Sequence, residues 1–157
     1  MSNSDNSHPL RRRAPIPREV CPLALAAEIL GDRWTLLILR EAFYGVVRYD
    51  DMLADLSAPR SMLTDRLSKL VDRGLIARKP YQEPGSRTRQ AYVLTDAGRA
   101  LGQTLIALSQ WGEAHVSKQP APIEFVERET SRPVRAALIN DEGQNVALGK
   151  VEMRLRE

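Results

Sequence analysis

Hydrophobic residues between positions 57 and 76 recur at steps of three and four, with polar residues in the positions between them. A helix places such positions on one face, and the members of this apolar face are Leu63, Leu67, Leu70 and Val71. The opposite face carries hydrogen-bonding and charged side chains, namely Arg60, Ser61, Thr64, Asp65, Ser68 and Lys69. With Ser57 as a capping residue, Pro59 in the first turn and Gly74 as a stop, the pattern predicts an amphipathic helix of about four turns.

Three shorter helices are predicted ahead of this one. Residues 23–30 have helical apolar spacing, and Asp32 can cap a second helix over residues 33–43 that is apolar around much of its circumference. Asp50 can cap a third helix, which a short connector, Ser57-Ala58, joins to the amphipathic helix. Two helices joined in this way, the second with a polar outer face, form a helix-turn-helix. In that motif the first turns of the second helix reach base edges in the DNA major groove, whereas a plain surface helix would leave its polar face solvated. The residues of this face expected to contact DNA are Arg60, Ser61, Thr64, Asp65 and Ser68.

The residues beyond the amphipathic helix predict a β-hairpin. Two strands, residues 75–80 and 91–94, flank a turn-rich tip at residues 83–86. A hairpin placed directly after a helix-turn-helix is a wing. Arg87 and Arg89 follow its tip, where they can lie along a phosphate strand or in a minor groove. Solvated loop charge is the alternative role for both, and the helix-turn-helix in front of them favours DNA.

A further helix is predicted after the wing, beginning at a Thr95 cap and extending to about His115. Its apolar positions keep helical spacing, and they are Leu101, Leu105, Leu108 and Trp111. This stripe is longer than the core of a small winged helix requires, so it predicts a dimer interface. His115 lies near the C-terminal end of the helix and fits a capping or solvated role better than a ligand role.

The two ends of the chain differ from its middle. Residues 1–19 are polar and contain three prolines and the run Arg11-Arg12-Arg13, which predicts a flexible basic arm that either touches phosphates or only aids solubility. Residues 118–157 alternate apolar and polar positions around a turn at Asp141-Glu142-Gly143, which predicts a β-rich extension of two or three strands. A piece this short cannot stabilise itself, so it must pack on the main domain or on a partner subunit. Residues 20–117 are then the DNA-binding and dimerisation domain.

Composition and charge narrow the possible functions. The chain has 157 residues and a net charge of +3, but residues 58–99 carry a local charge of +5 and residues 20–57 a local charge of −3. A basic segment centred on the helix-turn-helix favours a polyanionic partner. A single cysteine, Cys21, and two distant histidines indicate neither a disulfide framework nor a metal or cofactor site. No apolar run approaches the roughly 20 residues that span a bilayer, and no apolar signal core stands at the N-terminus, so a cytoplasmic protein without a membrane partner is expected.

Five segments of the sequence together resemble a known family. They are Cys21-Pro22, GDRWTLLILRE (31–41), MLTDRLSKLVDRGLI (62–76), YVLTDAGRAL (92–101) and SQWGEAH (109–115). Through them, residues 21 to about 116 resemble the HxlR-type family of bacterial winged-helix transcriptional regulators. The resemblance implies a homodimer whose recognition helices, here the helix within residues 57–76, and wings bind a pseudo-palindromic operator in double-stranded DNA. Pro59 stands where the family pattern usually has a polar residue.

The resemblance also implies roles for residues outside the helix-turn-helix. Family regulators dimerise through their N-terminal helices and the helix after the wing, which places in the interface Leu23, Trp34, Leu105, Leu108 and Trp111. Several members sense oxidants or electrophiles through a cysteine near the start of the first helix, and Cys21 matches that position. A thiol at a helix N-terminus gains thiolate character from the helix dipole. A small core residue is the alternative role for Cys21.

The expected fold is α+β and mainly helical: a winged helix-turn-helix with a C-terminal dimerisation helix and a small β-strand appendage. The expected function is sequence-specific DNA-binding transcriptional regulation by a homodimer, with repression favoured over activation and an oxidant, electrophile or small molecule as a possible effector. A winged-helix module for protein partners is the alternative, but it would not need arginines at the wing tip together with Arg60, Ser61 and Thr64 on the outer helix face. An enzyme is not expected, because one cysteine and two remote histidines cannot supply a nucleophile, a base and an orienting group.

Overall fold

The computed structural model of the chain describes residues 13–156, so the predicted arm falls mostly outside the described residues. The described helices are η1 (Arg18–Val20), α1 (Pro22–Leu30), α2 (Arg33–Phe43), α3 (Tyr49–Leu56), α4 (Arg60–Asp72), α5 (Asp96–Ala100), α6 (Gly102–His115) and η2 (Leu148–Lys150). The two strands are β1 (Ile76–Tyr81) and β2 (Arg89–Leu94). None of these helices is long and apolar enough to cross a membrane.

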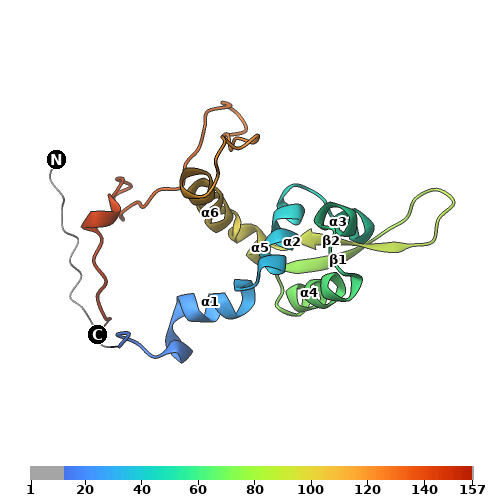
Figure 1. Ribbon diagram of the computed structural model, residues 1–157, viewed down its shortest axis with the longest axis horizontal. Coiled ribbons are helices and arrows are strands. Elements are labelled where there is room, and N and C mark those ends of the chain that lie inside the picture. Colours follow the sequence, from blue (N-terminus) through green and yellow to red (C-terminus); the bar gives the residue numbers. More distant parts are fainter. Residues whose placement is uncertain (1–12, 157) are drawn as a thin grey trace.

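The core lies where α2, α3 and α4 meet the start of β1 (Figure 1). Its fully buried large side chains are Ile38, Leu39, Met52, Leu63, Leu67, Leu70 and Ile76. The apolar stripe predicted on the amphipathic helix is therefore the buried face of α4, where each leucine contributes about 1.5–3 kcal/mol by leaving water. Val71, the fourth member of the stripe, is only partly buried at the edge of this core.

Several predicted helix ends are confirmed by the structure. The Asp32 side chain accepts hydrogen bonds from the backbone N–H groups of Trp34 and Thr35 at the start of α2. Thr95 accepts one from the Gly98 N–H at the start of α5. Gly74 follows α4 with a φ of 70°, a left-handed conformation that glycine adopts without a steric cost.

Two predicted caps are wrong. Asp50 lies inside the first turn of α3, because that helix already begins at Tyr49. Ser57 does not cap α4; it ends α3 in the left-handed region with a φ of 47°. Pro59 is the residue before α4, in an extended conformation with a φ of −60° that its ring favours, so the helix starts at Arg60 with no side-chain cap.

The wing is an antiparallel hairpin whose register runs from Ile76 paired with Leu94 to Tyr81 paired with Arg89. A single further bridge, between Arg48 and Ala91, ties the middle of β2 to the residues before α3. The hairpin extends from one end of the body, whereas α1 and α6 leave the other end (Figure 1). The wing and α4 therefore share one side of the molecule, away from the helices predicted to dimerise.

The helix predicted after the wing is divided into α5 and α6 by a break at Leu101. Gly98 of α5 lies so close to the Leu75 carbonyl that a Cβ would approach its oxygen to 2.1 Å. Only glycine permits this contact, which presses the short α5 against the start of the wing. The longer α6 then projects from the body.

The extension differs from the predicted strands. Residues 118–156 form two turns closed by isolated bridges, Val126 with Pro133 and Ile139 with Asn145, followed by the short helix η2 and six residues without helix or strand. The predicted turn at Asp141-Glu142-Gly143 is present inside the second bridge, with Gly143 at a φ of 79°. The alternating sequence does not form strands because, in the part of the chain that the structure describes, no strand lies beside either turn to extend the pairing.

Candidate nucleic-acid interface

The outer face of α4 presents the polar residues that the sequence assigned to DNA. Arg60, Ser61, Thr64 and Asp65 are exposed, and Ser68 is half-buried. The first two stand in the first turn of the helix, where side chains of a recognition helix reach base edges. Leu63 and Leu67 anchor the opposite face in the core, so the helix cannot rotate to hide these polar groups.

Tyr49, which the sequence analysis did not single out, positions this face from α3. Its hydroxyl donates to the backbone carbonyl of Arg60 at 3.0 Å and contacts Thr64 Oγ1 at 3.1 Å. The phenol donates its one proton to the Arg60 carbonyl. The Thr64 hydroxyl is therefore the donor in the second contact, and the Tyr49 oxygen accepts. The outward lone pairs of the Thr64 hydroxyl are then free to accept a hydrogen bond from a base. A tyrosine in the first turn of the preceding helix was the only sequence signal for this role.

Asp65 is the one anionic member of the predicted contact set. Its carboxylate forms ion pairs with Lys69, at 2.9 Å, and with Arg66. The hydrogen bond from Lys69 has the largest effect on the pKa of Asp65 and, with the charges of Lys69 and Arg66, lowers it. The local charge of the face therefore remains positive, which suits a helix that approaches phosphates. A base that donated to Asp65 would have to compete with Lys69.

The two wing arginines lie in different environments. Arg87 is exposed at the tip, with no ion pair among residues 13–156. Arg89, at the start of β2, is paired with Asp50 of α3 at 2.9 Å. A second link, from Arg48 to Glu83 at 2.5 Å, joins the residue before α3 to the wing tip. Arg87 is thus the freer of the two predicted wing arginines, while Arg89 also fastens the wing to the helix-turn-helix.

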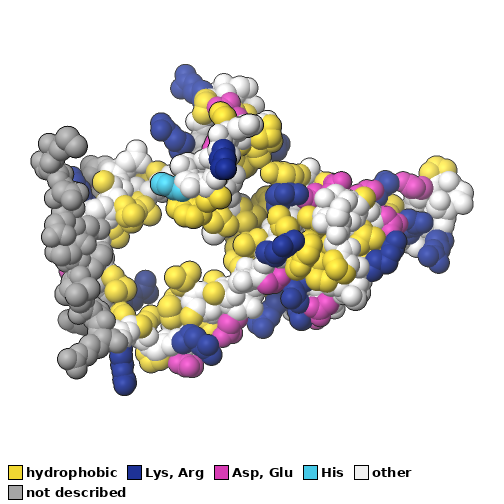
Figure 2. Space-filling view, in the orientation of Figure 1, with side chains coloured by type: hydrophobic (Ala, Val, Ile, Leu, Met, Phe, Trp, Pro, Cys, Tyr) yellow, Lys and Arg dark blue, Asp and Glu magenta, His cyan; other side chains and the backbone are white. Residues whose placement is uncertain are grey.

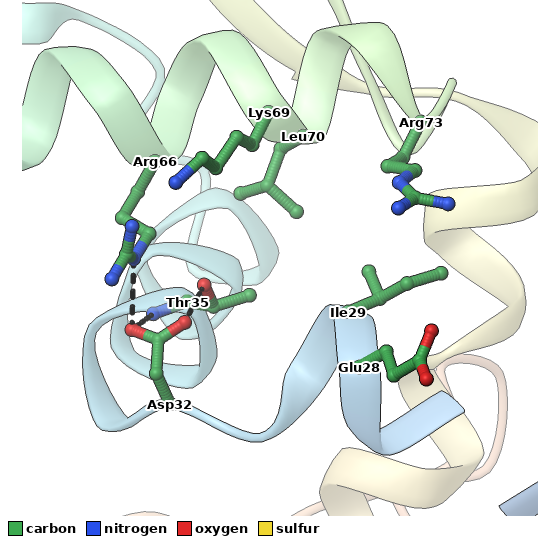
Figure 3. A pocket seen from close by; sticks show the side chains of 8 residues that line it. All are labelled: Glu28, Ile29, Asp32, Thr35, Arg66, Lys69, Leu70 and Arg73. Carbon is green, nitrogen blue, oxygen red and sulfur yellow. Dashed lines mark hydrogen bonds and ion pairs between the residues drawn. The ribbon is translucent and has the colours of Figure 1, made fainter. Parts of the chain in front are cut away.

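A second set of contacts holds α4 from the side of α2, where the Asp32 side chain at the start of α2 reaches Arg66 of α4 (Figure 3). Its carboxylate caps α2, accepts the Thr35 hydroxyl at 2.5 Å, and accepts Arg66 Nε at 3.1 Å. Partial burial opposes ionisation of Asp32, but the hydrogen bonds from Thr35 and Arg66, with the Arg66 charge, lower its pKa. The same pairing raises the pKa of Arg66.

Asp32, Thr35 and Arg66 together form one wall of a cavity of about 330 Å³ between α1, α2 and α4. Figure 3 shows Glu28 and Ile29 of α1 facing Arg73 and Leu70 of α4 across it. The junction of α1 and α2 therefore contacts the helix that carries the polar outer face. Sequence reasoning identified Asp32 only as a cap, because its Arg66 partner lies 34 positions away.

Some of the residues predicted to form a dimer interface are exposed to solvent in the single chain. Leu23 of α1 is 78% exposed, and Leu108 and Trp111 of α6 are 46% and 57% exposed. Leu105 instead packs against the edge of the core, and Trp34 is half-buried beneath the Arg33 guanidinium, which stands 4.3 Å from its ring centre.

Cys21 is half-buried at the N-cap position of α1, directly before Pro22. His115 lies beside the Trp111 ring, with 5.6 Å between the ring centres. Among the described residues, no group of three histidine, cysteine or carboxylate side chains is arranged to hold a metal ion.

Comparison with known proteins gives this architecture a family. A family model described as HxlR-like helix-turn-helix matches residues 29–120, which is more than half of the chain. The HTH-type transcriptional regulator MT3179 of Mycobacterium tuberculosis is 44% identical over 97 residues, which cover 62% of this chain and 60% of that protein. The match thus spans about three fifths of the length of that relative.

Two solved structures extend the likeness beyond the winged helix. PA1607, provisionally named a transcription factor, aligns with a TM-score of 0.75 at 32% identity and covers 86% of this chain and 94% of its own. PA1374 of Pseudomonas aeruginosa, named in the same way, aligns with a TM-score of 0.59 at 34% identity, covering 87% and 92%. These shares exceed what residues 1–117 can supply, so the likeness reaches into the extension, which the sequence resemblance had left out. On the family match and the winged helix described above, the chain belongs to the HxlR-like helix-turn-helix family of transcriptional regulators.

Proposed function

We propose that this protein binds a pseudo-palindromic operator as a homodimer and represses transcription from it. The observation that carries the proposal is the outer face of α4, where Arg60, Ser61 and Thr64 are exposed at the N-terminal end of a helix fixed on both sides. Tyr49 fixes it from α3, and Asp32 fixes it from α2. A helix held this rigidly presents its side chains to a groove with little loss of conformational entropy on binding.

Each polar residue has a distinct proposed role. Arg60 can donate two hydrogen bonds to a guanine edge, which is the commonest specific contact in a major groove. The Thr64 hydroxyl accepts from a base amino group, because its own proton is donated to the Tyr49 oxygen. Ser61 and Ser68 add shorter contacts on the same face, and Arg87 reaches a phosphate from the wing.

The test begins with an operator recovered by selection from a random DNA library, using the full-length protein. Fluorescence anisotropy then compares Arg60→Ala with the wild type on that operator and on random DNA. Loss of a guanine contact costs about 1–3 kcal/mol, or roughly 5- to 150-fold in affinity, on the operator but not on random DNA. Arg128→Ala is the matched control, because Arg128 is an exposed arginine in the extension.

Each outcome of this test has a defined meaning. If Arg60→Ala weakens both DNAs equally, Arg60 binds a phosphate and the base-reading assignment is wrong. If selection recovers no preferred sequence and the protein binds no DNA, the alternative function as a protein-binding module is favoured instead.

Repression is the simplest outcome of operator binding. A dimer seated on a promoter blocks polymerase by occupancy alone, whereas activation needs a further surface that contacts polymerase. Transcription in vitro from a promoter that overlaps the selected operator should fall as the protein is added. A rise in transcript would assign the protein as an activator.

An effector is proposed to act through Cys21. The thiol stands at the start of α1, and its neighbour Leu23 is one of the exposed apolar residues proposed to contact the second subunit. Oxidation to a sulfenic acid or a mixed disulfide would add polar bulk at this position. The spacing of the two recognition helices would then change, and operator affinity with it.

A further inference from the structure

Exposed apolar side chains are concentrated outside the winged-helix body. Sixteen large hydrophobic residues are exposed among those described, and all but Tyr44 lie before α2 or from α6 onward. The four in the last part of the chain are Leu148, Val151, Met153 and Leu155, with exposed fractions of 73%, 44%, 62% and 63%. Single exposed apolar residues are ordinary, but a concentration of this size marks an interaction surface.

The extension has an anchored part and an unanchored part. The Gln110 side chain donates to the Val134 carbonyl and accepts from the Ala136 N–H, both at 2.9 Å. Glu113 accepts from the Ala121 N–H at 2.8 Å, so residues 121–136 are fastened to α6. From Asn140 onward, every hydrogen bond in the described chain joins positions within the extension itself. We call residues 140–156 the distal extension.

The distal extension leads away from the body toward the start of α1 (Figure 1). Together with α1 and α6 it surrounds an opening, and Figure 2 shows hydrophobic side chains along the edges of that opening. A single chain therefore leaves the apolar surfaces of α1, α6 and the distal extension facing an empty space. This space is continuous with the surfaces already proposed for the dimer.

The exposed area indicates how much surface a partner must cover. A compact monomer of 17.6 kDa exposes about 7,900 Å² by the size scaling of folded proteins. This chain exposes 13,105 Å². The thirteen residues outside the described range account for at most about 2,100 Å², at roughly 160 Å² for a fully exposed residue. The remaining excess of roughly 3,000 Å² is enough for a subunit of an obligate dimer, which buries about 1,000–2,500 Å².

We propose that the distal extension packs on the α1 and α6 helices of a second copy of this chain and closes around them. The inference rests on the proposed homodimer and adds the segment that seals it. In a two-fold dimer the contact is made twice, since each subunit encloses the other. The apolar side chains of the distal extension meet those of the partner's helices, and the surfaces that a monomer exposes are buried together.

Site-specific photo-crosslinking of the full-length protein tests this arrangement. The photoreactive residue p-benzoylphenylalanine replaces Leu148 in one variant and Glu129, an exposed residue in the anchored part, in the control. The Leu148 variant should yield a covalent dimer on a denaturing gel, with the crosslinked peptide mapped to α1 or α6. The Glu129 variant should yield little or none.

Sedimentation of the same samples separates failure of this inference from failure of the proposed dimer. A non-covalent dimer in which the Leu148 variant crosslinks only within its own chain would overturn the inference and leave the dimer intact. A monomer would overturn both. As an independent measurement, Met153→Asp should raise the dimer dissociation constant at least tenfold, while Arg128→Asp should leave it unchanged. An unchanged constant for Met153→Asp would also contradict the proposal.

Discussion

Replacing Asp32 tests how firmly α4, the proposed recognition helix, is held. Its carboxylate accepts from the N–H groups of Trp34 and Thr35, from the Thr35 hydroxyl, and from Arg66 on α4. Asp32→Ala removes the helix cap and the ion pair together. Asp32→Asn keeps an oxygen for the cap but loses the charge that faces Arg66. Comparing the two variants therefore separates the cap of α2 from the link to α4.

The expected magnitudes follow from these contacts. Loss of an N-cap costs about 1 kcal/mol, within a range of roughly 0.5–2 kcal/mol. The side chains of Arg66 and Asp32 are 26% and 37% exposed, so solvent screens their ion pair, which contributes about 0.5–1 kcal/mol. Asp32→Ala should lower the free energy of unfolding by about 1.5–2 kcal/mol, and Asp32→Asn by about 0.5–1 kcal/mol.

The same residue predicts a pH dependence. The pKa of Asp32 is lower in the folded protein than its ordinary value, which is about 3.9 in an unfolded chain. The ionised carboxylate therefore gives its full stabilisation above that value, and this stabilisation is lost as the pH falls through the lower, folded pKa. The difference in unfolding free energy between the wild type and Asp32→Asn should be constant near neutral pH and shrink below about pH 4.

Urea unfolding followed by circular dichroism measures these differences. All proteins must be compared at one concentration, because the unfolding of a dimer depends on concentration. Asp51→Ala is the control, since Asp51 is an exposed aspartate in the first turn of α3; it should change stability by less than about 0.5 kcal/mol. A wild-type stability for Asp32→Ala would refute the role of this residue, and an equal loss in both Asp32 variants would show that the cap contributes nothing.

Three further predictions concern the wing, the dimer and the thiol. Arg87→Ala should reduce the slope of log affinity against log salt by about one, and Arg89→Ala by less, because Asp50 competes for Arg89; equal reductions in salt titrations would show that Arg89 leaves Asp50 for DNA. Trp111→Ala removes a large exposed aromatic ring from α6, so dimer and operator affinity should fall together; a wild type that sediments as a monomer at micromolar concentration would contradict this. Cys21→Ser should bind the operator with wild-type affinity, and peroxide should not change that affinity. If peroxide leaves the operator affinity of the wild type unchanged as well, Cys21 is a structural residue.

The sequence predicted the elements of the winged helix because helical spacing and capping residues are local signals. Leu63 and Leu67 repeat at the helical period, and Asp32 precedes an apolar run, so both could be interpreted without knowledge of the fold. The start of α3 was misplaced because an aspartate in a first turn and an aspartate cap look alike in sequence. The left-handed Ser57 could not be foreseen, since that conformation is uncommon outside glycine.

The candidate site was predictable only as a set of exposed polar positions. The pairing of Asp32 with Arg66 and of Arg89 with Asp50 joins residues 34 and 39 positions apart, and sequence spacing carries no signal for such contacts. The prediction of strands in the extension was wrong for a related reason. An alternating segment forms a strand only where a neighbouring strand pairs with it, and residues 118–156 meet none among residues 13–156.

The hydrogen bond between Tyr49 and Thr64 has a consequence for how the operator of such a regulator evolves. The Thr64 hydroxyl donates its one proton in a hydrogen bond to the Tyr49 oxygen, so in the proposed interface a residue that need not touch DNA decides whether Thr64 can donate to a base or only accept from one. A change of Tyr49 to phenylalanine would free that proton, and Thr64 could then donate as well as accept. Binding sites could drift toward new sequences through such a broadened intermediate, with every residue on the proposed DNA-facing side of α4 left unchanged.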